Sequence, residues 1–276
     1  MKKANFSVPQ SSRIHGNILG VRVTSTSKEQ VLRFFRSKLS NFNPPILASE
    51  KISVITPNPE LLNMATKSLE LKGILNSATV AVPDGVGIDF AWRFLGLPGK
   101  LKLIKGRVLF LELMSLANKK AWRVFFLGDK AAEETNKVLS RSLKRVKIEA
   151  MDGPWLDSDG NPHGKEDETK ETQSISKINE FKPHILFVGF NAPKQEKWVY
   201  KWLPRLNVGA AMVVGGTFDY VSGKTQLPPK WMEKVGLEWL WRLIRQPWRI
   251  GRIINAVVVF PLRVLISRFN HDSVQA

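Results

Sequence analysis

Residues 184–216, HILFVGFNAPKQEKWVYKWLPRLNVGAAMVVGG, contain an apolar run, a polar loop, a helical pattern and a second apolar run that ends in two glycines. The same alternation recurs along the chain, where the apolar runs NILGVRVT, KISVITP, TVAVPDG and WRVFFLGD each precede a helix-like segment. Strands that are buried on both faces of a sheet read as continuous apolar runs, and parallel neighbours need a crossover helix. The sequence therefore predicts an α/β fold, with a Rossmann-like, mostly parallel sheet and helices on both faces.

The composition limits the classes of site and compartment. The chain has 276 residues and no cysteine, which excludes disulfides and thiolate metal sites, and its four histidines are too scattered to suggest a zinc cluster. We divide it into a basic N-terminal arm (1–16), an α/β core (17–223) and a helical C-terminal appendage (224–276). The arm lacks the apolar segment of a signal peptide, so we expect a cytoplasmic protein.

The net charge of +18 indicates an anionic partner: nucleic acid, a phospholipid surface or a phosphorylated substrate. The appendage carries nine Lys and Arg against three Asp and Glu, and four of the nine tryptophans. No nucleic-acid-reading motif is present, and no G-x-G-x-x-G of a nicotinamide-dependent oxidoreductase follows a strand. A basic nucleotide- or nucleic-acid-binding protein without transferase activity remains the alternative to an enzyme.

Candidate ligand-binding residues follow the apolar runs, because ligands of open α/β sheets bind beyond the carboxyl ends of the strands. Glycines let backbone N–H groups approach phosphates, and hydroxyl or amide side chains suit sugars and bases. A glycine in a turn is more often only a turn, so each signal is weak alone. The candidates are Thr56, Asn58, Asp84, Gly85, Gly128, Asn191, Gln195, Gly215, Gly216 and Thr217.

Asp84 stands between a proline and a glycine after TVAV. Two roles are open for its carboxylate: an N-cap of the helix predicted over GVGIDFAWRF, or a general base. Gln195 is either a ligand-binding amide or part of an exposed helix face. Lys194 and Glu196 are expected to form a solvated pair on that face.

The segments TPNPELL, VPDGVGIDFAWRFLG, VFFLGDKAAEE, ILFVGFNAPKQEKWV and VVGGTFDYVSGKTQLPPKWMEKVGLEWLWRLIRQPWRIGR occur in this order over about residues 17–255. They resemble the WecG/TagA/CpsF glycosyltransferase family. The resemblance implies transfer of a hexose-type sugar, usually N-acetylmannosamine or its uronic acid, from a UDP-sugar. The implied acceptor is a sugar on undecaprenyl diphosphate, in the synthesis of teichoic acid, common antigen or capsule, and no further cofactor is implied.

The resemblance also implies roles for single residues. Asp84 matches the proposed catalytic base of the family, Thr56 and Asn58 match its TPN segment, and Gln195 matches its PKQE segment. We therefore expect Thr56 and Gln195 to be catalytic together with Asp84, and Asn58 to bind substrate. The chain departs from the family's R-x-x-G-S-D pattern, since KLKLIKGRVLF has Leu103 and Arg107 at the nearest positions. Lys102, Lys105 or Arg107 are the residues that could supply the missing positive charge.

The diphosphate of a UDP leaving group needs neutralisation by a metal ion or by basic side chains. The one D-x-D triplet, Asp157–Asp159, has a turn-forming context, so we expect no metal site. Arginines bind diphosphate oxygens bidentately. Arg242, Arg245, Arg249 and Arg252 would share one face of a continuous helix, although Pro247 is expected to break it near Gln246.

The last segment, IINAVVVFPLRVLISRF, is apolar but interrupted by charge. Its longest uncharged run, Ile253–Leu262, has ten residues, and about 20 are needed to span a bilayer. We therefore expect an interfacial helix on the anionic cytoplasmic face of the membrane, with core packing or an oligomer contact as the alternative. We also expect the appendage to be an active-site lid, whose arginines close over the donor diphosphate. The sequence leaves a homo-oligomer open.

Overall fold

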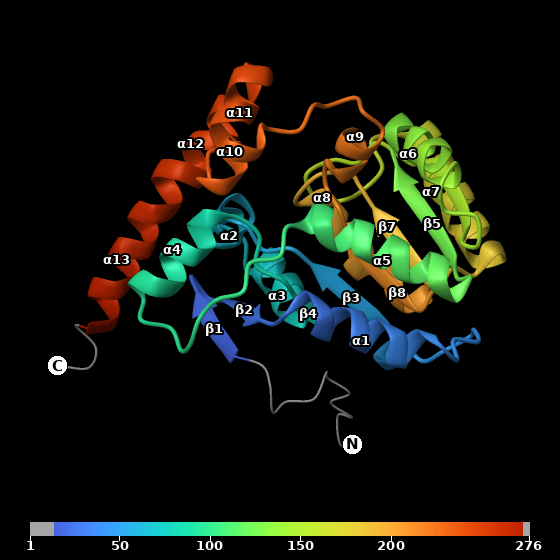
Figure 1. Ribbon diagram of the computed structural model, residues 1–276, viewed down its shortest axis with the longest axis horizontal. Helices are drawn as coiled ribbons and strands as arrows, with labels where there is room; N and C mark the ends of the chain where they lie inside the picture. The colour runs from blue at the N-terminus through green and yellow to red at the C-terminus, as the bar shows by residue number, and fades with distance from the viewer. Residues whose placement is uncertain (1–13, 273–276) are drawn as a thin grey trace.

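A computed structural model describes residues 14–272 of the chain, so most of the predicted N-terminal arm lies outside the described residues. Its centre is a six-stranded, entirely parallel sheet in the order β4-β3-β8-β7-β5-β6 (Figure 1). The strands are β3 (Ile52–Ile55), β4 (Val80–Ala81), β5 (Arg123–Gly128), β6 (Lys147–Asp152), β7 (Ile185–Val188) and β8 (Ala210–Val213).

The first predicted strand is not part of this sheet. NILGVRVT contributes instead to an antiparallel hairpin of β1 (Ile14–Ile18) and β2 (Val21–Ser25), joined through Leu19 and Gly20, both with positive φ. A two-residue turn of this kind pairs adjacent strands directly, so no crossover helix follows β1. Because β1 begins at Ile14, residues 14–16 belong to the hairpin and not to the expected arm.

Helices cover both faces of the sheet, as the alternation predicts. One face packs against α1 (Lys28–Leu39), α5 (Gly106–Lys120), α6 (Lys130–Ser140) and α9 (Thr217–Val221). The other packs against α2 (Pro59–Ala65), α3 (Leu69–Ser77), α4 (Val86–Phe94), α7 (Lys165–Phe181) and α8 (Lys194–Trp202). Strand residues alternate between the two cores: Phe126 and Phe187 face one, and Phe125 and Leu186 face the other.

The appendage runs back over the edge of the sheet that holds α2 and α4 (Figure 1). It consists of α10 (Lys230–Lys234), α11 (Glu238–Arg245), a 3₁₀ turn (Pro247–Arg249), α12 (Ile250–Ile254), a π-helical turn (Asn255–Val259) and α13 (Phe260–Asp272). The π turn ends two residues before Pro261, whose ring and missing N–H disturb regular α-helical bonding. Phe260 and Val264 are fully buried in the core beside α2 and α4.

The length of the last helix differs from the expectation. Residues Pro247–Phe269 form one helical stretch of 23 residues that contains an 18-residue window with a mean hydropathy of 1.8, long and apolar enough to cross a membrane by length and composition. Counting only uncharged residues underestimated it, because arginines interrupt the apolar run without interrupting the helix. Its outward side chains are apolar and exposed, including Ile254, Val258, Leu262, Ile266 and Phe269.

Candidate active site

The carboxyl ends of β3 and β4 bring Thr56 and Asp84 together. The backbone N–H of Asp84 donates to the carbonyl of Pro57 (2.9 Å), which continues the parallel pairing beyond the strands. A methyl group built on Gly106 would lie 3.4 Å from Asp84 Oδ2 and 3.5 Å from Thr56 Oγ1. The hydroxyl, the carboxylate and the first turn of α5 therefore line one small region.

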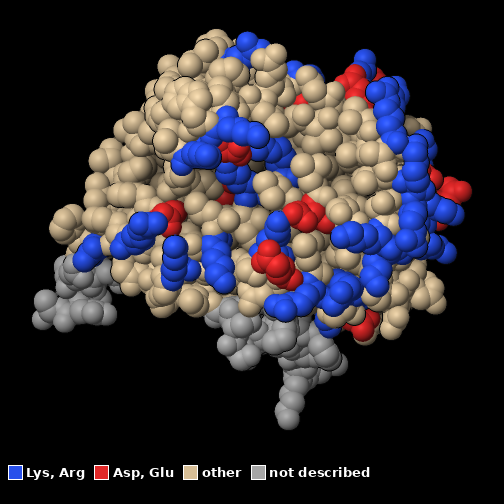
Figure 2. Space-filling model, viewed as in Figure 1, with Lys and Arg blue, Asp and Glu red and all other residues tan. Residues whose placement is uncertain are grey.

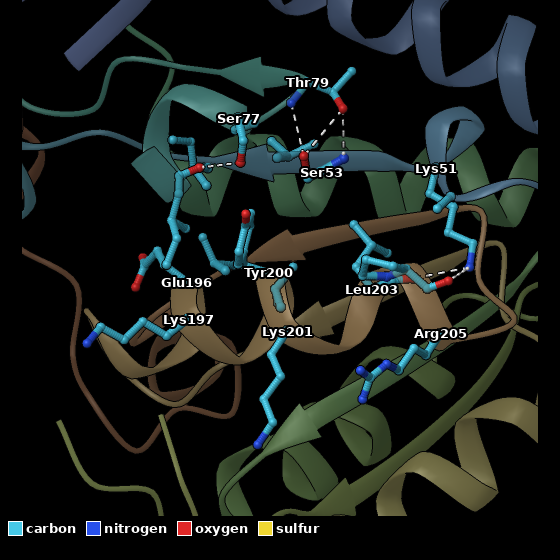
Figure 3. A pocket seen from close by; sticks show the side chains of 18 of the residues that line it. Lys51, Ser53, Ser77, Thr79, Glu196, Lys197, Tyr200, Lys201, Leu203 and Arg205 are labelled. Atoms are coloured by element: carbon cyan, nitrogen blue, oxygen red, sulfur yellow. Dashed lines mark hydrogen bonds between the residues drawn. The ribbon is translucent and has the colours of Figure 1, made fainter. Parts of the chain in front are cut away.

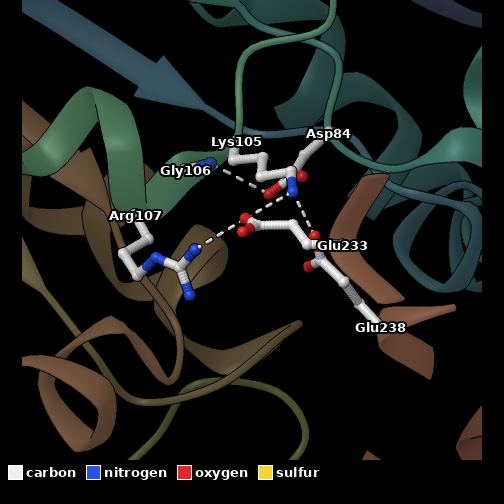
Figure 4. Close-up of polar contacts among 6 residues, drawn as sticks. All are labelled: Asp84, Lys105, Gly106, Arg107, Glu233 and Glu238. Atoms are coloured by element: carbon white, nitrogen blue, oxygen red, sulfur yellow. Dashed lines mark hydrogen bonds and ion pairs between the residues drawn. The ribbon is translucent and has the colours of Figure 1, made fainter. Parts of the chain in front are cut away.

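Asp84 is not the cap of the helix that follows it. Gly85 occupies the N-cap position of α4 with φ 94°, a conformation that favours glycine, and no side chain caps the helix there. The Asp84 carboxylate instead accepts a hydrogen bond from the Gly106 N–H (3.0 Å), at the start of α5 (Figure 4). The N-cap hypothesis is wrong, and the carboxylate faces the site.

The environment of Asp84 pulls its pKa in two directions. Burial raises the pKa above the ordinary value of 3.8, and the Gly106 N–H, Arg242 and Lys105 oppose this rise, while Glu238 adds to it. The carboxylate is thus half-buried but close to positive charge. A carboxylate with a raised pKa is a better proton acceptor than an exposed aspartate.

The appendage places arginines beside this carboxylate. The guanidinium groups of Arg242 and Arg107 both lie over the ring of Tyr220, each 5.5 Å from its centroid. Burial and the neighbouring Arg252 and Arg242 lower the pKa of Arg249. Arg245 lies over the ring of Trp241. Within the described chain, neither Arg242 nor Arg249 forms an ion pair, so their charges remain available.

The expected single arginine face does not exist as one helix. α11 ends at Arg245, and Gln246 is extended at φ −139° and ψ 66° before Pro247 starts the next turn. The break before Pro247 is thus confirmed. Arg252 lies beyond it and forms an ion pair with Glu60 at the start of α2. The bend separates Arg252, which anchors the appendage, from Arg242, which faces Asp84.

Two carboxylates that the sequence reasoning missed complete this cluster (Figure 4). Glu233 Oε1 lies 2.6 Å from Lys105 Nζ and 3.0 Å from an Arg107 nitrogen, and Glu238 also pairs with Lys105. Lys105 and Arg107 therefore supply positive charge where the R-x-x-G-S-D pattern is absent, whereas Lys102 is exposed. Glu233 and Glu238 flank the Val-Gly-Leu turn of the appendage, and nothing in their local sequence pointed to Asp84.

Gln195 is buried between β7 and β8 and not on an exposed face. Its Oε1 accepts from the Gly215 N–H (3.0 Å), and its Nε2 donates to Glu196 Oε1 (2.9 Å). Burial raises the pKa of Glu196 to about 7, and its Oε2 has no partner among the described residues. The expectation of a solvated pair with Lys194 is wrong, because α8 turns Glu196 inward while Lys194 reaches the Leu156 carbonyl.

Several other candidates have clear structural roles. Asn58 caps α2 by accepting from the Leu61 N–H, and the Thr217 hydroxyl donates to the Val214 carbonyl. A side chain on Gly128 would meet the ring of Phe218 at 3.1 Å. Asn191 is exposed with φ 65°, and Gly216 precedes the short helix α9. These residues shape the loops at the carboxyl edge of the sheet.

The Asp157–Asp159 triplet forms the expected turn. Asp157 accepts hydrogen bonds from the N–H groups of Asp159 and Asn161. Across residues 14–272 no group of three His, Cys, Asp or Glu side chains is arranged to hold a metal ion. The Asp157 side chain is thus occupied by the backbone of its own turn, and Asp159 forms an ion pair with Lys197.

A separate groove of about 870 Å³ opens between α3 and α8 (Figure 3). Ser53, Thr79, Glu196 and Lys197 line it, and Lys51 closes one end by donating to three backbone carbonyls. Asp84 and Arg242 are not among its lining residues. This groove and the charged cluster around Asp84 are therefore different places on the molecule.

A parallel α/β sheet with a carboxylate and unpaired guanidinium groups at its carboxyl edge is typical of enzymes that act on nucleotide-activated substrates. The model of the glycosyl transferase WecG/TagA/CpsF family matches residues 16–274, and the chain belongs to this family. This confirms the resemblance seen in the sequence.

Named relatives are similar over most of their length. The N-acetylglucosaminyldiphosphoundecaprenol N-acetyl-β-D-mannosaminyltransferase of Bacillus subtilis (strain 168) is 31% identical over 225 residues, which cover 80% of this chain and 82% of the relative. The enzyme of the same name from Bacillus spizizenii is 31% identical over 73% of this chain and 74% of its own. That of Staphylococcus aureus (strain MW2) is 27% identical over 90% and 91%.

Proposed function

We propose that this glycosyltransferase moves a hexose-type sugar, N-acetylmannosamine or a close relative, from a UDP-sugar to a hydroxyl of an undecaprenyl-diphosphate-linked sugar. The activity named for the relatives supports the sugar and the acceptor. The observation that carries the proposal is the position of Asp84, a half-buried carboxylate at the sheet edge beside Arg242. The product would enter a cell-surface polysaccharide.

Asp84 acts as the general base in this proposal. A sugar hydroxyl is a weak nucleophile until a carboxylate accepts its proton during attack on the anomeric carbon. The Gly106 N–H fixes one carboxylate oxygen and leaves the other free to accept that proton. Attack by the hydroxyl opposite the departing UDP inverts the anomeric configuration. Thr56 lies beside the carboxylate and offers a hydroxyl to the substrate.

In this proposal, arginine side chains neutralise the diphosphate of the leaving UDP in place of a metal ion. UDP leaves with additional negative charge on its diphosphate, and guanidinium groups bind such oxygens bidentately. Arg242 and Arg249 have no acidic partner in the described chain, and Arg245, which forms no ion pair there either, lies on the same helix as Arg242. We expect transfer without a divalent metal, since basic side chains fill this role.

The appendage is also the proposed membrane contact, on the cytoplasmic face. Its last helix has exposed apolar side chains on one side, while Arg252, Arg263 and Arg268 contact the core on the other. A helix that is attached along its length to a charged domain cannot cross a bilayer beside it. We therefore favour a peripheral position, with the apolar side in the interface. The appendage would then both contact the membrane that holds the lipid acceptor and form the lid over Asp84.

Other basic side chains are spread over the face of the molecule seen in Figure 2. Figure 2 shows Lys and Arg distributed along the edge of the molecule that holds α6 and α7, and a second group mixed with acidic side chains near α10 and α11. A dispersed basic edge suits attraction to an anionic surface better than specific binding.

Purified full-length protein tests the proposal with radiolabelled UDP-sugars and a short-chain lipid-diphosphate-N-acetylglucosamine acceptor. We expect label in the lipid product with UDP-N-acetylmannosamine or a related UDP-hexose. Product formation should require the acceptor and be lost in Asp84→Asn. The proposal is overturned if no UDP-sugar gives product while another nucleotide-sugar does.

A further inference from the structure

The cations at the start of α5 are occupied by the appendage itself (Figure 4). One oxygen of Glu233 bridges Lys105 and Arg107 at 2.6 and 3.0 Å, and the carboxylate of Glu238 shares the same lysine. Two adjacent anionic groups are thus held by two adjacent basic side chains. A diphosphate presents the same arrangement, two neighbouring anionic centres that can share a cation.

Four basic side chains gather around Asp84 and Tyr220, in two different states. Lys105 and Arg107 are neutralised by the two carboxylates, whereas Arg242 and Arg249 have no acidic partner in the part of the chain that is described. The ring of Tyr220 joins the two groups, because Arg107 and Arg242 both lie over it.

The proposed reaction brings two diphosphates to this place, one on the donor and one on the lipid acceptor. Two free arginines suit one diphosphate, and the other then needs Lys105 and Arg107. We propose that Lys105 and Arg107 bind a substrate diphosphate, and that Glu233 and Glu238 hold its place until it arrives. This inference rests on the proposed function, because the diphosphates come from its two substrates.

The geometry allows the exchange without unfolding the appendage. The side chains of Lys105, Glu233 and Glu238 are about one third exposed, at 34, 29 and 30%, so water competes for these ion pairs. Met232, the neighbour of Glu233, is buried and keeps α10 in place. The carboxylates need only rotate away, and the incoming diphosphate replaces their negative charge.

A simpler role for the same contacts is a latch that holds α10 and α11 on the core. The two roles predict opposite changes in diphosphate affinity when the carboxylates are removed. If the carboxylates compete with substrate, their removal strengthens diphosphate binding. If they only hold the appendage closed, their removal weakens binding, since Arg242 then leaves the site.

Isothermal titration calorimetry of the full-length protein distinguishes these roles, with UDP and a soluble short-chain N-acetylglucosamine diphosphate lipid as separate probes. For the probe that uses this site, we expect Lys105→Met or Arg107→Met to weaken binding by about tenfold, because a charge-assisted bond is lost. The double variant Glu233→Gln, Glu238→Gln should strengthen binding of that probe by about three- to tenfold, because carboxylates no longer compete for Lys105 and Arg107. The probe that responds identifies which diphosphate binds here.

Matched controls keep general charge effects apart. Lys102→Met removes an exposed lysine of the same loop, and Glu112→Gln removes a carboxylate from another ion pair of α5, with Lys28. Neither should change the affinity by more than about twofold, since exposed ion pairs contribute little. If the double variant unfolds, Glu238→Gln alone and Lys105→Arg replace it: the first should strengthen binding, and the second should preserve it.

The outcomes separate the inference from the function beneath it. If the Lys105, Arg107 and Glu variants bind both probes as tightly as the wild-type protein does, the inference is overturned and the transferase proposal stands. Weaker binding in the Glu variants also overturns it, in favour of the latch. No binding of either probe, together with no sugar transfer, overturns both.

Discussion

The core and the appendage are held by different forces. Strands β5, β7 and β8 lie in continuous apolar surroundings, where Phe126, Phe187 and Met212 are completely buried. The appendage buries few large side chains, mainly Met232, Phe260 and Val264, and makes most of its other contacts through ion pairs and arginine hydrogen bonds. The core is thus stable through burial, while the position of the appendage depends on charge.

This difference shows which region contributes which groups to the site around Asp84. The core supplies Asp84 at a fixed place, because the strands before it and the Gly106 N–H define its position. The appendage supplies Arg242 and Glu238, which alter the charge around that carboxylate. The carboxylate that we propose as the base thus belongs to the core, and charged groups around it belong to the appendage, whose ion pairs salt would weaken.

The largest effect is expected from the core side of the site. Asp84→Asn keeps an oxygen for the Gly106 N–H but cannot accept a proton, so kcat should fall by about 10²–10⁴-fold. Thermal unfolding should show a melting temperature close to that of the wild type, and initial rates with saturating substrates give kcat. Near-normal turnover in a folded variant would remove Asp84 from the mechanism.

The second prediction concerns the apolar anchor of the appendage. Phe260→Ala should weaken docking of the last helix by about 3 kcal/mol, as for other buried aromatic truncations. Limited proteolysis should then cut within residues 247–269 while the α/β core stays intact. Exposed Leu262→Ala is the matched control, and we expect no change in proteolysis there. Equal unfolding of core and appendage would show that the two regions are not separable.

A third prediction uses the buried carboxyl of Glu196. Its pKa is about 7 in the folded protein, above the ordinary 4.5, so the folded state holds the proton more tightly than the unfolded chain. Stability should therefore fall as the pH rises from 4.5 to 7, by about 3 kcal/mol, and then level off. Glu196→Gln should remove this slope, measured by urea unfolding at pH 5 and pH 8. A wild-type protein that is equally stable at both would contradict it.

The smallest effect is expected from metal removal. Transfer rates with and without excess EDTA should agree within error, because Arg242 and Arg249 are assigned the diphosphate. Loss of activity that manganese restores would mean that the cations of the appendage do not suffice. A matched assay at high salt should, in contrast, lower the rate, since it screens the charges that position the appendage.

The fold follows closely from local patterns in the core and less so elsewhere. Apolar runs such as HILFVGF and GAAMVVGG identified the buried parallel strands, because burial on both faces leaves no polar alternation. The hairpin β1–β2 was missed, since its apolar residues also form a continuous run and its turn was not recognised. The prediction that Glu196 is solvated was wrong, because the direction of α8 relative to the sheet decides which side of the PKQE segment is buried.

The sequence by itself determined the α/β class, the break at Pro247 and the acidic residue after TVAV, because these depend on neighbours along the chain. Only the tertiary structure decided that Asp84 binds the start of α5, that Glu233 and Glu238 occupy Lys105 and Arg107, and that Gln195 joins β8 to Glu196. These contacts join residues that are about 20 to more than 100 positions apart. Packing of the fold brings these charged groups and hydrogen-bond donors together. A local sequence pattern therefore contains no information about these contacts.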